Sequence, residues 1–141
     1  MSLSPREVYQ AVNVSKGGVV LAERVELADT SSSRRRGLLG RSGLGSGEGL
    51  YLTPCEWLHT FGMRFCIDVA FLSPSGKVLA VYHSLRPNRL SRIVWSASGA
   101  LEIPDTSLRR TQTERGDVVH LLHMDALRPV QIGTIEQRGC S

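Results

Sequence analysis

Residues 65–85, FCIDVAFLSPSGKVLAVYHSL, contain the clearest strand patterns of the chain. Phe65 to Leu72 and Val78 to Leu85 are rich in apolar, β-branched and aromatic residues, which suit a pleated and half-buried surface. Between them lies Ser73-Pro74-Ser75-Gly76, a combination typical of tight turns. This stretch therefore predicts an antiparallel β-hairpin.

Shorter apolar runs on both sides of the hairpin predict further strands. They are 8–14, 19–27, 50–52, 93–95, 100–103 and 118–124, with 130–135 as a candidate edge strand. Lys16-Gly17-Gly18 predicts a hairpin turn between the first two runs. One short helix is expected, capped by Asp29 or Thr30, running to about Leu39 and ending its last turn at Gly40.

Many short strands with a single helix indicate an α+β fold that is mostly β. We expect an antiparallel small barrel or sandwich with one short helix near residues 30–40. A chain of 141 residues is long enough to bury its own core, so residues 1–141 are expected to form a single domain with a short C-terminal extension. Its 3 cysteines follow no C-x-x-C pattern and predict no disulfide framework.

Charge and composition narrow the classes of partner. The chain has 17 Lys and Arg against 13 Asp and Glu, and only Arg34, Arg35, Arg36 and Arg41 cluster locally. Nucleic-acid-binding proteins usually concentrate basic charge in a patch or stripe, so we expect a small polar or anionic ligand rather than nucleic acid. Without an apolar run of about 18 residues or a signal-peptide pattern, no membrane partner is expected and the predicted location is cytoplasmic. The oligomeric state is left open.

Asp68 is a lone carboxylate within the strongest strand pattern. Period 2 places Asp68 on one face with Arg64, Cys66, Ala70 and Leu72. A buried carboxylate needs a cation or several N–H donors. Asp68 is therefore predicted to be buried and to pair with Arg64, with one of the arginines between 34 and 41, or with backbone N–H groups.

The predicted hairpin register places Cys66 directly opposite His83. A thiol facing an imidazole could form a nucleophile and base, although activation also needs an orienting group and oxyanion donors. A small buried cysteine beside a partly exposed histidine is the alternative interpretation.

A bound metal is not expected. Cys55, His59 and either Asp68 or His83 offer suitable ligand types for zinc, but their spacing follows no known zinc pattern. His120 and His123 would point to opposite faces of a strand. We accordingly predict neither a metal nor another cofactor.

Several motifs resemble the domain of unknown function 192 family of bacterial and archaeal proteins. They are Arg35-Arg36-Gly37-Leu38-Leu39-Gly40-Arg41, Gly47-Glu48-Gly49-Leu50-Tyr51-Leu52, Pro54-Cys55, His59-Thr60-Phe61-Gly62-Met63-Arg64-Phe65, Ile67-Asp68-Val69-Ala70-Phe71-Leu72 and Gly116-Asp117, in order over about residues 27–122. The resemblance implies a compact, mostly antiparallel β fold with a short helix after the first hairpin, and no established activity. The chain departs from the pattern with Cys66 in place of a proline and Trp57 in place of an aliphatic residue. Carried over by position, the polar motif residues are Arg36, Arg41, Cys55, His59, Thr60, Arg64 and Asp68.

These residues predict a ligand-binding or accessory module with a small polar pocket. The pocket is expected between the connection from His59 to Arg64, the helix with Arg36 and Arg41, and the end of the strand that carries Asp68. Arginines would hold the ligand, His59 would add a hydrogen bond and Asp68 would orient an arginine. One alternative is a hydrolytic enzyme with His59 as general base and Asp68 as its orienting group. Another is a nucleic-acid or protein adaptor that uses the arginine-rich helix.

Overall fold

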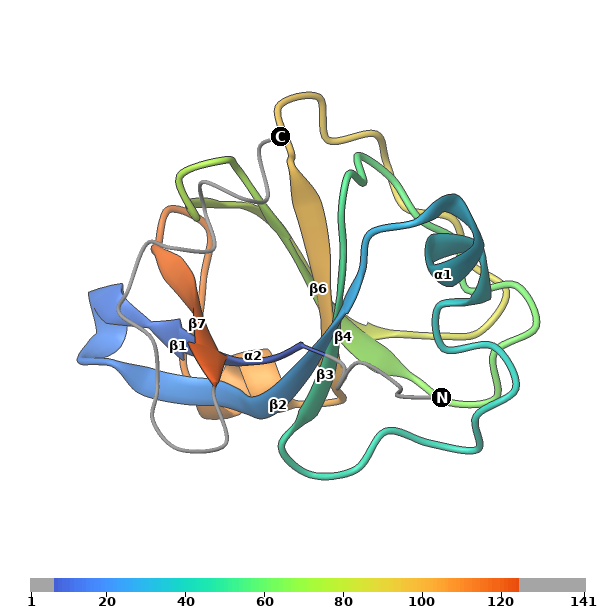
Figure 1. The fold of residues 1–141 in the computed structure, drawn as a ribbon, viewed down its shortest axis with the longest axis horizontal. Coiled ribbons are helices and arrows are strands. Elements are labelled where there is room, and N and C mark those ends of the chain that lie inside the picture. The colour runs from blue at the N-terminus through green and yellow to red at the C-terminus, as the bar shows by residue number, and fades with distance from the viewer. Residues whose placement is uncertain (1–6, 125–141) are drawn as a thin grey trace, which may run out of the picture.

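The computed structural model describes residues 7–124, which form one mixed β-sheet with two short helices (Figure 1). The strands are β1 (Val8–Asn13), β2 (Val19–Ala28), β3 (Glu48–Leu52), β4 (Ile67–Leu72), β5 (Val78–Leu85), β6 (Gly99–Pro104) and β7 (Val119–Met124). The helices are α1 (Ser31–Arg36) and α2 (Ser107–Arg110), and a 3-10 turn, η1 (Val14–Lys16), joins β1 to β2. The α+β, mostly β fold class predicted from the sequence is confirmed.

The sheet has the strand order β5-β4-β6-β3-β2-β1-β7 and does not close into a barrel. Its two edge strands approach at one end, where Lys77 bridges to Val118 and the Val119 N–H donates to the Gly76 carbonyl at 2.8 Å. The sandwich-like alternative is therefore the correct one. A purely antiparallel sheet is wrong, because β2 pairs with β3 in parallel. A parallel pair needs a crossover, and the chain between these strands supplies one that contains α1.

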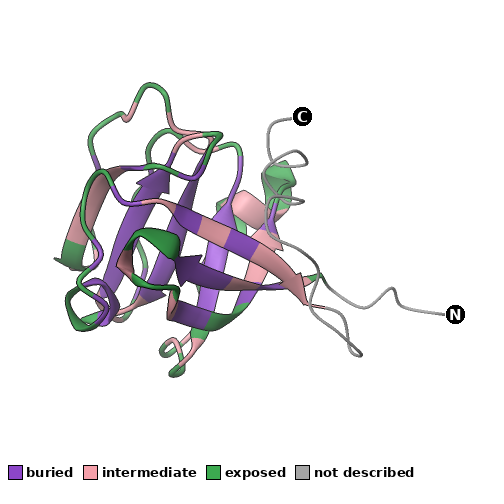
Figure 2. Cartoon of the chain, turned by 90° about the vertical axis from the view of Figure 1, so that its left-hand side faces the viewer, coloured by how far each residue is buried: buried purple, intermediate pink, exposed green. Residues whose placement is uncertain are grey.

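Two hydrophobic clusters occupy the two faces of the sheet. In β4 all six residues are buried. Ala70 and Leu72 belong to the cluster on the α2 side, whereas Ile67, Val69 and Phe71 belong to the cluster beneath α1 and the long connections. Figure 2 shows the buried strands between exposed loops. Because successive side chains of a strand point to opposite faces, β4 contributes residues to both hydrophobic clusters.

The helix near residue 30 is shorter than predicted. Thr30 caps α1 through a reciprocal capping box with Ser33, and α1 ends at Arg36. Gly37 has φ of 46°, a left-handed value that interrupts the helix before Leu39. The expected end at Gly40 is wrong for this reason. The second helix, α2, was not predicted, because its 4 residues are too few to show a periodic pattern.

Most strand predictions are confirmed within two residues, including both hairpins. Residues 93–95 are an exception, since they form no strand, and Ile93 and Trp95 are exposed. The apolar triplet alone therefore led to the prediction of a strand where the chain forms a surface loop. The candidate edge strand at 130–135 lies outside the described residues. Within residues 7–124, none of the helices has the length and apolar composition needed to cross a membrane.

Candidate functional site

A cavity of about 490 Å³ lies between α1 and the connection that follows β3. Its volume falls within the range of roughly 300–1,000 Å³ typical of small-molecule sites. The polar and aromatic residues that line it are Arg34, Arg35, Arg36, Cys55, Glu56, Trp57, His59 and Glu102. The cavity therefore has a basic wall from α1, an aromatic wall from the connection, and a buried carboxyl group from β6.

The basic wall consists of three successive arginines with different roles. Arg34 Nη1 donates to the carbonyls of Asp29 at 3.0 Å and Thr53 at 3.2 Å, and so ties α1 to the connection. Arg35 and Arg36 are exposed, and within the described part of the chain neither forms a salt bridge or side-chain hydrogen bond. These two guanidinium groups remain available to a ligand.

The aromatic wall is built by alternate residues of an extended segment. Trp57 and His59 have ring centroids 6.4 Å apart, and His59 stacks on Phe61 at 5.0 Å with an interplanar angle of 24°. An isolated β-bridge joins His59 to Leu90 and holds the segment extended. The Phe61 N–H donates to His59 Nδ1 at 3.2 Å, so Nδ1 acts as a hydrogen-bond acceptor within the segment. Trp57 is half exposed, so part of its ring is accessible.

Glu102 provides the buried end of the cavity. It is only 3% exposed, and its Oε2 atom has no hydrogen-bond partner among the described residues. Burial raises the pKa of Glu102 to about 8, against the opposing effect of the positive charge of Arg41. The carboxyl group is therefore mainly protonated at neutral pH, and it can donate a hydrogen bond to a ligand.

Cys55 lies beside this carboxyl group. Its Sγ donates to the Trp57 carbonyl at 3.2 Å. Burial, followed by the nearby Glu102, raises the pKa of the Cys55 thiol to about 11. A thiol with such a pKa carries almost no thiolate at neutral pH and is a poor nucleophile.

The cavity brings together only part of the predicted site. Arg36, Cys55 and His59 line it. Arg41 instead lines a neighbouring cavity of about 380 Å³, where its Nη2 lies 3.5 Å from Glu26 Oε2. Thr60 is buried and structural, since its hydroxyl donates to the Arg86 carbonyl at 2.6 Å and accepts from the Arg89 N–H at 2.8 Å.

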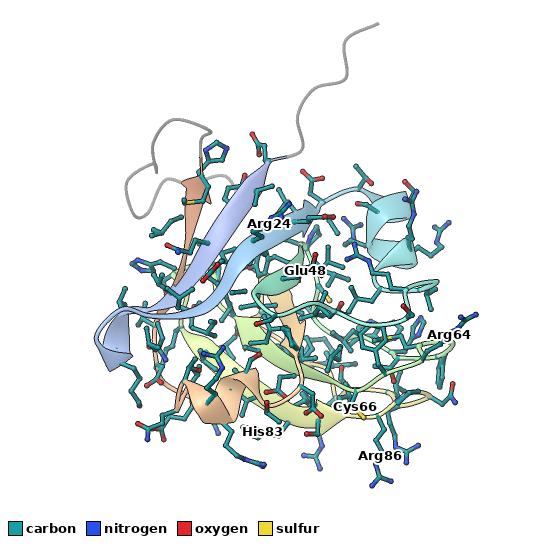
Figure 3. The ribbon with its side chains drawn as sticks, turned by 90° about the horizontal axis from the view of Figure 1, so that it is seen from below. Arg24, Glu48, Arg64, Cys66, His83 and Arg86 are labelled. Atoms are coloured by element: carbon teal, nitrogen blue, oxygen red, sulfur yellow. The ribbon has the colours of Figure 1, made fainter. Side chains whose placement is uncertain are left out.

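Arg64 and Asp68 also lie away from the cavity. Arg64 is exposed and projects away from the body of the molecule in Figure 3. Asp68 is fully buried on the opposite sheet face, where Oδ1 accepts from the Ser84 N–H and Oδ2 from the Leu108 N–H, each at 2.8 Å. Its predicted burial and backbone N–H partners are confirmed, whereas the predicted pairing with an arginine is wrong.

The expected opposition of Cys66 and His83 is also wrong. Ile67 pairs with Leu85 and Val69 with Tyr82, so a bulge places two residues of β5, His83 and Ser84, opposite Asp68. Cys66 precedes β4, and its neighbour Ile67 pairs with Leu85, two residues beyond His83. The pairing shifts by one residue at two points, between Phe71 and Leu72 and between Ile67 and Val69, and a register counted from the turn alone cannot anticipate such shifts.

Two further expectations concern metals and catalysis. Within residues 7–124, no group of three or more His, Cys, Asp or Glu side chains is placed to hold a metal ion, and the absence of a cofactor stays a prediction. His59 and Asp68 have separate partners, so they do not form the base and orienting group of the hydrolytic alternative.

Glu102 is the site residue that the sequence interpretation missed. It stands in the apolar run Ala100-Leu101-Glu102-Ile103. That pattern is the same signal, a lone carboxylate within a buried strand, that singled out Asp68. Applied to both strands, it would have found Glu102.

The model of an uncharacterized family, described as Uncharacterized ACR and abbreviated DUF192, matches residues 12–121. The chain belongs to the DUF192 family. The match begins earlier than the region of about 27–122 that the motifs indicated, and it includes the end of β1 and all of β2. A search of curated proteins found no match to this DUF192 chain.

Two solved structures share the fold of the DUF192 chain. A protein of unknown function from Novosphingobium aromaticivorans is 24% identical with a TM-score of 0.71, over 80% of this chain and 84% of that one. A putative transcription regulator from Sinorhizobium meliloti is 19% identical with a TM-score of 0.69, over 86% of this chain and 98% of that one. At these identities the likeness concerns the fold alone.

Proposed function

We propose that this DUF192 chain is a binding module for a small anionic ligand, which it holds in the cavity between α1 and the aromatic wall. The observation that carries the proposal is Glu102 Oε2, a buried polar atom at the cavity without a partner in the described part of the chain. Buried polar atoms are usually satisfied, and an unsatisfied one at a cavity suggests that a ligand completes it.

The charge of the cavity supports an anion. Arg35 and Arg36 are free to form charge-assisted hydrogen bonds, and Glu56 is the acidic lining residue that opposes them while Glu102 is protonated. The high pKa of Cys55 and the separate partners of His59 and Asp68 favour binding over the hydrolytic alternative.

The adaptor alternative receives less support. α1 has only six residues, and Arg34 is already bound to two backbone carbonyls. The name of the structural neighbour from Sinorhizobium meliloti suggests regulation of transcription for that protein, but 19% identity does not extend this role to the DUF192 chain.

A thermal-shift series with simple anions, from inorganic phosphate and pyrophosphate to organic carboxylates and phosphate esters, tests the proposal. At least one should raise the Tm, and Arg35→Ala/Arg36→Ala should abolish the shift. The matched control is Arg109→Ala/Arg110→Ala, which removes two exposed arginines from the end of α2, outside the cavity. The proposal of a ligand site at α1 would be contradicted if both double variants lost the anion-induced rise in Tm equally, or if no anion raised the Tm of the original chain.

A further inference from the structure

The two walls of the cavity differ in chemistry, and the difference narrows the ligand class. One wall presents the free guanidinium groups of Arg35 and Arg36, and the other presents the rings of Trp57 and His59. Guanidinium groups favour phosphate and carboxylate, whereas an accessible aromatic face favours a flat ring. A ligand that uses both walls has an anionic group and a planar ring.

The buried end of the cavity adds a third requirement. Glu102 Oε2 can form a hydrogen bond, but only with a polar atom that reaches past the two walls. A purely hydrocarbon ring would leave Oε2 unsatisfied. A heterocycle with nitrogen or carbonyl oxygen on its edge satisfies it and also stacks on the aromatic wall.

We propose, building on the proposed function, that the ligand is a nucleotide: its base lies against Trp57 and His59 with one edge toward Glu102, and its phosphate contacts Arg35 and Arg36. Base stacking on aromatic side chains combined with basic groups that follow the phosphate is a recurring way to bind nucleotides with little dependence on sequence. The same chemistry is offered by a free nucleotide and by a nucleotide within a single strand.

Tryptophan fluorescence can report the stacking directly. The chain has 2 tryptophans, and Trp95 is 73% exposed in a loop outside the cavity. Trp95→Phe therefore leaves Trp57 as the single reporter. Titration with AMP, CMP, GMP and UMP should quench its emission, and at least one should bind about tenfold or more tightly than ribose 5-phosphate or the matching nucleoside.

Variants assign each part of the ligand to a wall. Binding is measured by calorimetric titration in a chain that keeps both tryptophans. There, Arg35→Ala/Arg36→Ala should weaken nucleotide binding about tenfold or more while leaving nucleoside binding unchanged.

Two further positions test how the base is held. Trp57→Ala should remove the preference for nucleotide over ribose 5-phosphate. Glu102→Gln retains a hydrogen-bonding group and should change which base binds best, whereas Glu102→Ala should weaken binding of all four bases. Arg109→Ala/Arg110→Ala should bind like the original chain.

Binding of an eight-nucleotide single strand distinguishes a free nucleotide from a nucleotide within a nucleic-acid strand as the ligand. Salt-sensitive binding at least tenfold tighter than that of the mononucleotide indicates a nucleic-acid strand, and equal affinity indicates a free nucleotide. If ribose 5-phosphate or an aryl carboxylate binds as tightly as every nucleotide, the inference fails while the proposed function stands. If no anion binds, both fail.

Discussion

At the scale of single residues, Asp68 has a structural role that can be measured. Its two oxygens accept hydrogen bonds from the backbone N–H groups of Ser84 and Leu108, and the side chain is fully buried. Asp68→Ala leaves both amides without a partner, at a cost of about 1–3 kcal/mol for each. Urea unfolding should show this loss. Asp29→Ala, at an exposed carboxylate, should unfold like the original chain, and an equally stable Asp68→Ala variant would disprove the role.

Glu102 is the residue that should make stability depend on pH. Its pKa in the folded state is about 8, above the ordinary value of 4.5, so between these values the folded state holds a proton that the unfolded state has released. Stability due to this group is therefore fully present below pH 4.5 and is lost as pH rises toward 8, by about 1.4 kcal/mol for each unit by which the pKa is raised.

Glu102→Gln removes this titration. Its Tm should exceed that of the original chain by a margin that grows from pH 5 to pH 8 and then levels. Arg41 opposes the upward shift of the Glu102 pKa, and the neighbouring Cys55 thiol, with a pKa of about 11, stays neutral across that range. Glu23→Gln, at an exposed position, serves as the control, and a constant Tm difference across the range would show that Glu102 is ionised in the fold.

At the scale of elements, the capping box decides whether α1 holds its arginines in place. The Ser33 N–H donates to Thr30 Oγ1 and the Thr30 N–H donates to Ser33 Oγ, each at 3.0 Å. A six-residue helix has little stability of its own. Thr30→Ala should cost about 0.5–2 kcal/mol and speed amide hydrogen exchange in α1. Ser31→Ala is the neighbouring control, and unchanged exchange in Thr30→Ala would show that packing alone holds the helix.

At the scale of the whole molecule, Asn13 joins the end of β1 to the loop before β7. Its Nδ2 donates to Thr113 Oγ1 and to Asp117 Oδ2, each at 3.0 Å, and Asn13 is fully buried. Asn13→Ala should destabilise the fold by about 1–3 kcal/mol, because buried acceptors lose their donor. Lys16→Ala, which removes the more exposed contact to Asp117, should cost much less. Equal melting curves for the two variants would refute the role of Asn13.

Elements with local signals could be predicted from the sequence. The hairpin of β4 and β5 follows from two strand-forming runs and a turn, and the position of α1 follows from its cap at Thr30. The burial of Asp68 follows from a lone carboxylate in an apolar strand. In each case the physical cause lies within a few neighbouring residues.

Only the tertiary structure decided which polar residues share a site. Asp68 and Glu102 are similar in sequence pattern, but β4 and β6 present them to opposite faces, one to backbone amides and the other to the cavity. The pairing of β4 with β5, which has two register shifts, keeps Cys66 away from His83, and the parallel crossover places α1 beside the cavity. These outcomes depend on strand order and register, which are set by packing between segments far apart in the chain.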